Sequence, residues 1–488
     1  MNWQNKRVVI LGLARQGTAL ARYLVAHGAR VVASDMSAEL DLTDLKDLSG
    51  LSFVLGGHPF TLLDECDVLC LSGGVPIDLP IVLEAKRRGI PLSNDAQIFV
   101  EACPAPIIGI TGSAGKTTTT SLVGEMLKKQ EEGGEGVTRG RGEFAHSVLH
   151  PLTPSPPPRV FVGGNIGNPL ILNLGEIQPQ DKVVMELSSF QLELMTTSPH
   201  IACITNITPN HLDRHGTMDA YTAAKKHILD FQSSEDWQVL CADDPVTRTL
   251  NTQAKTAWFS INQEPQGDGA WMDEDGDLRL RTNAGRKTQD VDSALHPMSC
   301  VICHRRDLLL MGDHNILNVL AAALVSALAG ASIEAIRQVA TTFRGVAHRL
   351  QLIGEVNGAR WYDDSIATAP ERLMAALKCF TQPVILLCGG RDKHLPWAEA
   401  AQLMLSRCKH IILFGEMAQM VGDELRMVSG DIRHSSFVIR HSLEDAVLEA
   451  KHLARNGDVV LLSPGGTSYD AFKDFAERGD KFREYVNG

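Results

Sequence analysis

A glycine-rich loop between an apolar strand and a helix restricts the fold of this chain more than any other segment. It runs Gly109-Ile-Thr-Gly-Ser-Ala-Gly-Lys-Thr-Thr-Thr-Thr120, after the apolar residues 107–110 and before a predicted helix over 118–128. In such a loop, backbone N–H groups and the helix N-terminus face one point and bind phosphate there. Lys116 is placed to reach terminal phosphates and Thr117 to ligate Mg²⁺. The segment therefore predicts a nucleotide-binding α/β domain.

The spacing inside this loop is a shortened variant of the usual phosphate-loop pattern. Five residues separate Gly109 from Gly115, where the common pattern has four, and only two separate Gly112 from Gly115. A glycine turn without a ligand is the alternative. The Gly-Lys-Thr sequence between a buried strand and a helix favours the phosphate loop.

The length and the order of predicted elements indicate three α/β domains. At roughly 100 to 200 residues per domain, 488 residues correspond to about three. Strand, glycine turn and helix alternate from residue 6 until Pro104 and Pro106, and a third block starts near Val346. We expect a Rossmann-like domain over 1–104, a central P-loop ATPase domain over 105–345 and a Rossmann-like domain over 346–488. The central sheet should be mostly parallel with a small β excursion, and the glycine- and proline-rich stretch 131–158 should be a flexible insertion.

Composition excludes several classes of partner. Since 46 Lys and Arg stand against 58 Asp and Glu, the net charge is −12, and we expect no nucleic-acid partner. The longest apolar stretch, 319–331, is shorter than the roughly 18 residues of a membrane helix, and the N-terminal apolar run is too short for secretion. A cytoplasmic protein is the expectation. Residues 300–304, Cys-Val-Ile-Cys-His, match a haem-attachment pattern, but without an export signal a strand is favoured.

A second glycine loop, Gly12-Leu-Ala-Arg-Gln-Gly17, follows the first predicted strand. It resembles a dinucleotide fingerprint, but Ala14 stands where the middle glycine belongs. Asp35 ends the next strand, where an acidic residue would bind a ribose hydroxyl. From these residues, NAD binding, binding of another nucleotide and a purely structural turn remain equally open.

Further polar residues follow predicted strands of the central domain. Glu186 ends the strand 183–185 beside the phosphate loop, so it is a candidate metal ligand. His211 follows another strand and would complete a metal site, or it is structural. Asp213 and Arg214 fit a helix start as well as a catalytic pair. Lys225 lies on a predicted helix, where a solvated surface charge is the default.

The order of these motifs resembles that of the Mur ligases. The motifs are the phosphate loop, Gly163-Gly-Asn-Ile-Gly167, Glu186-Leu-Ser-Ser, Asn210-His-Leu-Asp-Arg214, Gly312-Asp-His-Asn315, Ala347-His-Arg349, Asp363-Asp-Ser365 and the C-terminal run from Phe472 to Gly479. Together they cover nearly the whole chain except 131–158. Within the family, the resemblance is greatest to members that add D-glutamate.

The resemblance implies an ATP-dependent ligase of peptidoglycan precursor synthesis. ATP would phosphorylate the carboxylate of UDP-N-acetylmuramoyl-L-alanine, and the amine of D-glutamate would attack the acyl phosphate. It also implies two Mg²⁺ ions and a carbamylated Lys225. We further expect no membrane insertion and a monomer. Because ATP would contact two domains, catalysis would require their closure.

The family's functional residues match positions in all three domains. The implied catalytic residues are Lys116, Glu186, His211 and Lys225. The implied ATP-binding residues are Gly112, Ser113, Ala114, Gly115, Lys116, Thr117, Thr118, Thr119, Asn315, Arg349 and Asp364. The implied metal ligands are Thr117, Glu186, His211 and carbamylated Lys225. The residues implied for the UDP substrate are Arg15, Gln16, Asp35, Ser37, Gly73 and Asn165, and those implied for D-glutamate are Thr368, Lys393, Ser468 and Phe475.

The sequence departs from the family pattern at several positions. Ala114 replaces the usual Asn of the loop, and Ile366 interrupts the usual Asp-Ser-Lys-Ala-Thr. Residues 465–467, Gly-Gly-Thr, replace a small run before Ser468 in the amino-acid pocket. The alternatives are therefore another Mur-type ligase that takes L-alanine or a diamino acid, an NAD-dependent oxidoreductase, and a P-loop ATPase without ligase activity.

Overall fold

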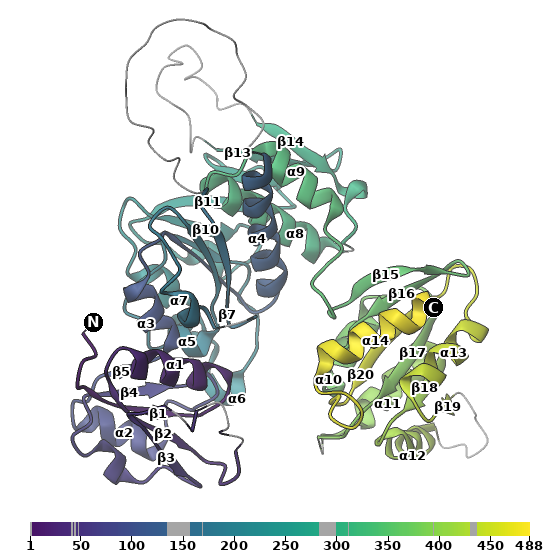
Figure 1. The fold of residues 1–488 in the computed structure, drawn as a ribbon. Helices are drawn as coiled ribbons and strands as arrows, with labels where there is room; N and C mark the ends of the chain where they lie inside the picture. Colours follow the sequence, from purple (N-terminus) through teal and green to yellow (C-terminus); the bar gives the residue numbers. More distant parts are fainter. Residues whose placement is uncertain are drawn as a thin grey trace, which may run out of the picture. The chain divides into compact units, whose positions relative to one another are not determined.

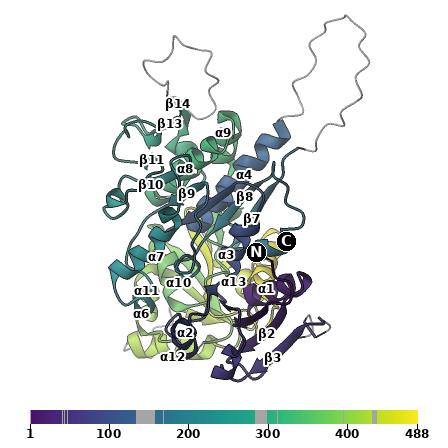
Figure 2. The same ribbon diagram turned by 90° about the vertical axis from the view of Figure 1, so that its left-hand side faces the viewer.

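The chain folds into two compact units, Met1–Phe343 and Arg344–Gly488 (Figures 1 and 2). The structure is a computed structural model, and it describes residues 2–40, 42, 45–46, 48–133, 157–167, 169–282, 299–310, 312–393, 395–429 and 437–488. Most of the predicted insertion 131–158 lies outside these residues. Across the described ranges, no helix is long and apolar enough to cross a bilayer.

The first unit begins with a parallel sheet in the order β3-β2-β1-β4-β5. Its strands, as far as they are described, are β1 (Arg7–Leu11), β2 (Arg30–Asp35), β3 (Leu51–Leu55), β4 (Val68–Leu71) and β5 (Leu92–Ser93). The helices beside it are α1 (Arg15–Ala26), α2 (Pro80–Arg87) and α3 (Asp95–Ala102). The strands are apolar runs because both faces of a parallel sheet are covered.

The second glycine loop, which ends at Gly17, predicts a helix that begins at Thr18, but α1 begins three residues earlier, at Arg15. Gly17 belongs to the helix and not to the preceding turn, since a Cβ at this position would lie 1.9 Å from the carbonyl oxygen of Gly12. The glycine therefore allows close approach of helix and strand, which its place in a glycine-rich turn does not reveal.

A larger sheet follows in the same unit, in the order β14-β13-β12-β11-β10-β9-β6-β8-β7. Its described strands are β6 (Ile107–Thr111), β7 (Val160–Gly164), β8 (Lys182–Glu186), β9 (Ile201–Ile204), β10 (Trp237–Cys241), β11 (Lys255–Ser260), β12 (Gly269–Met272), β13 (Asp277–Arg281) and β14 (Cys300–His304). The pairs from β7 to β12 are parallel, and β12, β13 and β14 are antiparallel. The predicted β excursion is thus present, and the Cys-Val-Ile-Cys-His segment is its last strand.

Helices cover the central sheet and form a hydrophobic core together with it. The described ones are α4 (Lys116–Gly133), α5 (Ser189–Leu192), α6 (Leu212–His215), α7 (Met218–Asp230), α8 (Asp313–Leu328) and α9 (Ile333–Thr342). Eleven residues of α8 are buried, consistent with its almost wholly apolar sequence. Strand β6 lies between β8 and β9, so the carboxyl ends of these three strands meet at one edge.

The second unit contains a sheet in the order β15-β16-β20-β17-β18-β19. Its described strands are β15 (Gln351–Val356), β16 (Ala359–Asp363), β17 (Val384–Gly389), β18 (Cys408–Phe414), β19 (Phe437–Ile439) and β20 (Val459–Gly465). Its helices are α10 (Pro370–Lys378), α11 (Ala398–Arg407), α12 (Ala418–Ser429), α13 (Leu443–Leu453) and α14 (Phe475–Asn487). Only the β15–β16 pair is antiparallel in this sheet as described. The predicted class, α/β with mostly parallel sheets, is confirmed.

Candidate active site

The predicted phosphate loop connects β6 to α4, and two of its glycines adopt backbone conformations that other residues rarely adopt. Gly112 has φ of 149° and Gly115 has φ of 82°. A Cβ at Gly112 would lie 1.9 Å from Thr205 Oγ1, and one at Gly115 would lie 2.2 Å from Asn318 Oδ1. Both conformation and space therefore demand glycine.

The segment after β9 holds this loop in place. Thr205 Oγ1 donates to the carbonyl of Ala114 at 2.6 Å, and Asn206 Oδ1 accepts from the amide of Ala114 at 2.9 Å. The amide of Ser113 donates to the carbonyl of Asn206 at 2.9 Å. Sequence reasoning gave Thr205 and Asn206 no role. Their position directly after a strand was the one signal in the sequence. It points to the phosphate loop only when β9 is known to pair with β6.

Two lysines meet at the first carbonyl of the loop. Lys116 Nζ, in the first turn of α4, donates to the carbonyls of Gly112 at 2.9 Å and Ser113 at 3.2 Å. Lys225 Nζ, on α7, donates to the same Gly112 carbonyl at 2.8 Å. The structure therefore brings together two residues that lie 109 positions apart in the sequence (225 − 116). The ammonium group of Lys116 places a positive charge beside the glycine loop, where it attracts phosphate.

Other predicted ATP residues surround the loop. Thr117, Thr118 and Thr119 occupy the first turn of α4. Thr119 Oγ1 lies 3.5 Å from Asn318 Oδ1, and Asn318 Nδ2 donates to Asn315 Oδ1 at 3.1 Å. The start of α8 thus lies beside the loop, which is where an ATP-contacting Asn315 is expected. Asn318 was not among the predicted residues.

Glu186 is the last residue of β8 and is almost fully buried, with 1% of its surface exposed. Its Oε1 accepts a hydrogen bond from Asn165 Nδ2 at 2.9 Å, while Oε2 is buried with no hydrogen-bond partner. A buried carboxylate oxygen without a partner is costly, and a bound cation would satisfy it. Within the described ranges, no three His, Cys, Asp or Glu side chains gather to hold a metal. A cation here would need ligands of other types, such as the hydroxyl of Thr117.

Lys225 is buried and not a surface charge, with 1% of its surface exposed. Burial and, less strongly, the nearby charge of Lys116 lower the pKa of its ammonium group to about 7, although the charge of Glu186 acts in the opposite direction. A large fraction of this side chain is therefore a neutral amine near neutral pH. A neutral amine is a nucleophile, whereas an ordinary lysine is protonated.

His211 precedes α6 and is exposed, with a left-handed backbone at φ of 52°. Its ring makes an edge contact with the ring of Phe190, with centroids 5.3 Å apart. Phe190 lies on α5, in the turn that follows Glu186. Helix α5 therefore links the two residues: it begins three residues after Glu186, and its Phe190 contacts His211.

The predicted UDP residues gather at the carboxyl ends of strands in the first sheet. Gln16 lies against Gly73, where a Cβ would be 2.8 Å from Gln16 Oε1. Asp35 accepts hydrogen bonds from the amides of Leu13 at 2.7 Å and Ser37 at 2.9 Å. The bond to Leu13 joins the carboxyl ends of β1 and β2.

Arg15 and Asn165 connect this end of the first sheet to the central sheet. Arg15 donates to the carbonyl of Asn165 at 3.4 Å. Because the side chain of Asn165 also binds Glu186, one residue links the predicted UDP site to the candidate metal site.

In the second unit, Asp364 follows β16 and is buried. Burial raises the pKa of its carboxyl group to about 7, although Ser463, the Leu350 amide and the charge of Arg349 act in the opposite direction. Ser463 donates to it at 2.8 Å. Arg349 therefore lies close enough to Asp364 for its charge to act on the carboxyl group.

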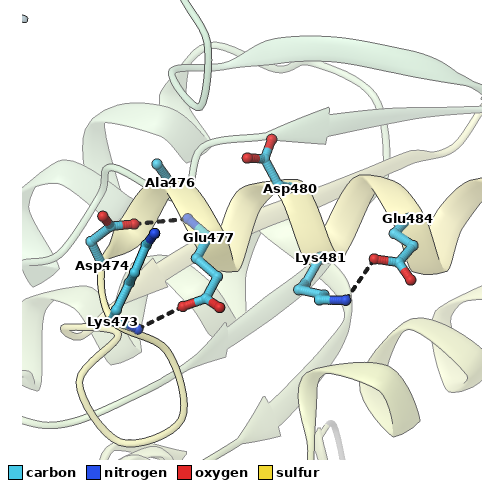
Figure 3. Close-up of a pocket in the computed structure, with 7 residues that line it drawn as sticks. All are labelled: Lys473, Asp474, Ala476, Glu477, Asp480, Lys481 and Glu484. Carbon is cyan, nitrogen blue, oxygen red and sulfur yellow. Dashed lines mark hydrogen bonds and ion pairs between the residues drawn. The ribbon is translucent and has the colours of Figure 1, made fainter.

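The predicted amino-acid residues of the second unit form two groups. Lys393 Nζ donates to Thr368 Oγ1 at 3.2 Å. Ser468 is buried after β20, and Phe475 begins α14. Two backbone amides fix that helix start, because Glu477 N donates to Asp474 Oδ1 and Lys473 N donates to Glu477 Oε2, each at 2.8 Å (Figure 3).

A surface pocket lies along the exposed side of α14 (Figure 3). Lys481 and Glu484 form an ion pair there at 2.7 Å. None of the predicted site residues lines this pocket.

The site combines a phosphate loop, two neighbouring lysines and a buried carboxylate at the ends of parallel strands. This combination defines the class of P-loop enzymes that use a nucleoside triphosphate. Three family models match consecutive parts of the chain. They are the Mur ligase MurD-like N-terminal domain over 6–94, the Mur ligase middle domain over 110–326 and the Mur ligase glutamate ligase domain over 348–466. The chain belongs to the Mur ligase family.

Curated relatives match over nearly the full length. The UDP-N-acetylmuramoylalanine–D-glutamate ligase of Symbiobacterium thermophilum is 39% identical, with 99% of this chain and 98% of the relative covered. The ligases of the same name from Acetivibrio thermocellus and Clostridium novyi are 37% and 36% identical, each with 99% of this chain and 97% of the relative covered. The predicted family and ligase class are therefore confirmed.

Solved structures support the fold. UDP-N-acetylmuramate-alanine ligase MurC from Thermotoga maritima has a TM-score of 0.53 at 18% identity, with 99% of both chains covered. MurF from Acinetobacter baumannii has a TM-score of 0.52 at 17% identity, with 98% of this chain and 94% of that chain covered.

Proposed function

We propose that this protein uses ATP to join D-glutamate to UDP-N-acetylmuramoyl-L-alanine, producing ADP and phosphate. The proposal rests on the similarity to UDP-N-acetylmuramoylalanine–D-glutamate ligases over nearly the full length of the chain. The ligase of Symbiobacterium thermophilum, for example, is 39% identical over 99% of this chain. The MurD-like N-terminal domain model over 6–94 supports the same assignment.

The reaction needs activation, because a carboxylate is a poor electrophile. In the proposed sequence, the substrate carboxylate attacks the γ-phosphorus of ATP and ADP leaves. The amine of D-glutamate then attacks the acyl carbon, loses a proton and expels phosphate, which leaves an amide. Lys116 suits the first step, since its ammonium group beside the loop neutralises charge on the transferred phosphate.

We assign ATP to the phosphate loop and the residues around it. The proposed ATP-binding residues are Gly112, Ser113, Ala114, Gly115, Lys116, Thr117, Thr118, Thr119, Asn315, Arg349 and Asp364. The loop glycines and the bonds from Thr205 and Asn206 support the first part of this set. Arg349 and Asp364 rest on their match to family positions.

We assign Mg²⁺ to Thr117, Glu186, His211 and Lys225 as carbamate. The unpartnered, buried Oε2 of Glu186 fits this group. When bound, Mg²⁺ neutralises phosphate charge and orients the oxygens for in-line transfer. Thr117 and Glu186 supply oxygen donors, and His211 supplies a ring nitrogen.

Carbamylation of Lys225 is part of this proposal. The neutral amine of Lys225 would add to CO₂, forming an N–C bond and releasing a proton, which turns the neutral amine into an anionic carbamate. Its burial beside Glu186 supports the proposal, because a carbamate there would share a cation with that carboxylate. A Lys225→Ala variant should lose activity at low bicarbonate, and unaltered activity would refute the role.

The remaining assignments concern the two other substrates. We propose that the UDP substrate is bound by Arg15, Gln16, Asp35, Ser37, Gly73 and Asn165, and D-glutamate by Thr368, Lys393, Ser468 and Phe475. We further propose domains over 1–104, 105–345 and 346–488, a monomeric state and a cytoplasmic location.

Phosphate release tests the function directly. It should require both UDP-N-acetylmuramoyl-L-alanine and D-glutamate. Release with L-alanine or a diamino acid in place of D-glutamate would reassign the substrate, and release without any uridine nucleotide would favour a P-loop ATPase. Binding of NAD to residues 1–104 would favour an oxidoreductase.

A further inference from the structure

Arg214 makes contacts that the proposed function does not yet explain. It lies in α6, three residues after His211, and its sequence context left a helix start and a catalytic role equally open. In the structure, its guanidinium group donates to the carbonyls of Gly74, at 3.2 Å, and Val75. Both acceptors belong to the loop after β4, in the first sheet, which also contains Gly73. Arg214 therefore connects the central sheet to the loop that is proposed to contact the UDP substrate.

The same guanidinium group packs on Phe190. Its central carbon lies 3.9 Å from the centre of the Phe190 ring, the distance of a cation–π contact. The Phe190 ring also contacts His211 at 5.3 Å and stacks on His215 at 5.3 Å between centroids, with the planes 4° apart. One aromatic ring thus touches Arg214, which reaches the first sheet, and His211, a proposed metal ligand.

The segment that carries these side chains is anchored on its other side. The side chain of His215 is buried, with its Nδ1 2.9 Å from Glu193 Oε1 and its Nε2 3.0 Å from Ser189 Oγ. The single turn of α6 lies between two residues with positive φ, His211 before it and Gly216 after it. A short turn fixed at both ends moves as one piece, so a displacement of Arg214 would displace His211.

We propose that Arg214 is a positioning residue that couples the UDP-substrate loop to the metal-binding His211. Through its two carbonyl contacts it holds the loop 73–75, and through Phe190 it holds His211. A substrate that orders this loop would therefore also order a metal ligand. The inference rests on the proposed function, because that function supplies the UDP substrate and the metal.

Arginine is suited to this role and lysine is not. A planar guanidinium group donates to two carbonyls at once while its face rests on an aromatic ring. An Arg214→Lys variant keeps the charge but loses the planar fork of N–H donors and the flat face. It should therefore show most of the defect of Arg214→Ala, and it separates geometry from charge.

The first experiment measures binding without turnover. Calorimetry with UDP-N-acetylmuramoyl-L-alanine, in the absence of ATP and Mg²⁺, gives the Kd of the wild-type protein and of Arg214→Ala. We expect the variant to bind about tenfold more weakly, the change that the loss of a charge-assisted hydrogen bond produces. Arg87→Ala is the matched control, since Arg87 is exposed on α2 of the same unit and pairs with Glu84. Its Kd should equal that of the wild type.

The second experiment measures the metal requirement. The Mg²⁺ concentration for half-maximal phosphate release should rise severalfold in Arg214→Ala and in Phe190→Leu, while the KM for D-glutamate stays unchanged. Phe190→Leu keeps both carbonyl contacts of Arg214 but removes the ring, so its Kd for the UDP substrate should change less than that of Arg214→Ala. Melting temperatures report whether each variant is folded.

Two results would overturn the inference. If Arg214→Ala has a lower melting temperature but wild-type Kd and Mg²⁺ requirement, the residue is merely structural. If the Kd rises while the Mg²⁺ requirement is unchanged in every variant, the link to His211 does not exist. Should Arg214→Ala fail to fold, Arg214→Lys gives the same two readouts. Absence of D-glutamate-dependent phosphate release in the wild-type protein would count against the proposed function, and the calorimetric comparison would still stand.

Discussion

Replacing Gly112 by alanine should strongly impair ATP use. The new Cβ would lie 1.9 Å from Thr205 Oγ1 and 3.1 Å from Thr205 Cβ, so the threonine must move. Its hydroxyl would then lose the bond to Ala114, worth about 1 kcal/mol. The positive φ of 149° adds about 1 to 2 kcal/mol. The total of about 2 to 3 kcal/mol corresponds to a roughly 30- to 150-fold loss in kcat/KM for ATP.

The assay is steady-state phosphate release over a range of ATP concentrations, together with calorimetry of the UDP substrate. Binding of the UDP substrate should be unaffected, because its proposed residues lie on other strands. Gly267→Ala is the matched control, since Gly267 also has positive φ, 74°, but a Cβ there meets no atom within 4 Å. It should therefore keep normal kinetics. If Gly112→Ala changes kcat/KM for ATP less than threefold relative to this control, the packing of the loop against Thr205 does not support ATP binding.

Three further changes test buried charges and the amino-acid site. Burial raises the pKa of Asp95 to about 6 from 3.8, so its ionisation costs stability as pH rises from about 4 to 6, up to about 3 kcal/mol above pH 6. Asp95→Asn should therefore raise the melting temperature at pH 8 and not at pH 4; an equal effect at both pH values would contradict this. Lys225→Arg keeps a cation but forms no carbamate, so kcat should fall at least about 100-fold, and wild-type protein should lose activity in CO₂-free buffer and regain it with bicarbonate. Lys393→Ala should raise the KM for D-glutamate about tenfold, as expected for loss of a charged hydrogen bond, with an unchanged Kd for the UDP substrate; a change in the UDP substrate instead would reassign Lys393.

The sequence was sufficient for the fold class because local patterns repeat along it. Apolar runs followed by glycines, as at residues 7–17 and 107–115, identify strand–loop–helix units regardless of their surroundings. Parallel strands buried on both faces have few polar interruptions, so their positions were accurate to a few residues. The start of α1 was misplaced because Gly17 looks like a turn residue in sequence, whereas its function is to let the helix approach Gly12.

The site was predictable only where a residue's role is encoded by its neighbours in sequence. Lys116 and Thr117 follow from the loop motif itself. Lys225 does not, because nothing around it in the helix distinguishes a buried lysine from a solvated one, and only the family resemblance corrected that default. Its burial and its bond to the Gly112 carbonyl depend on packing between α7 and the loop.

Residues that act across sheets were beyond sequence reasoning for a related reason. Arg214 contacts carbonyls about 140 positions earlier in the chain, and backbone carbonyls leave no signature in the side-chain sequence. Asn165 likewise joins Arg15 to Glu186 through one backbone oxygen and one amide group. Such contacts place the proposed UDP site and the proposed metal site on one connected framework within residues 1–343. Because the acyl phosphate must form where the UDP substrate and ATP meet, a rigid link between their sites would fix the distance over which phosphate is transferred. Because the rate of phosphate transfer depends steeply on that geometry, we expect Arg214, Phe190 and His215 to support catalysis by holding the two sites in place.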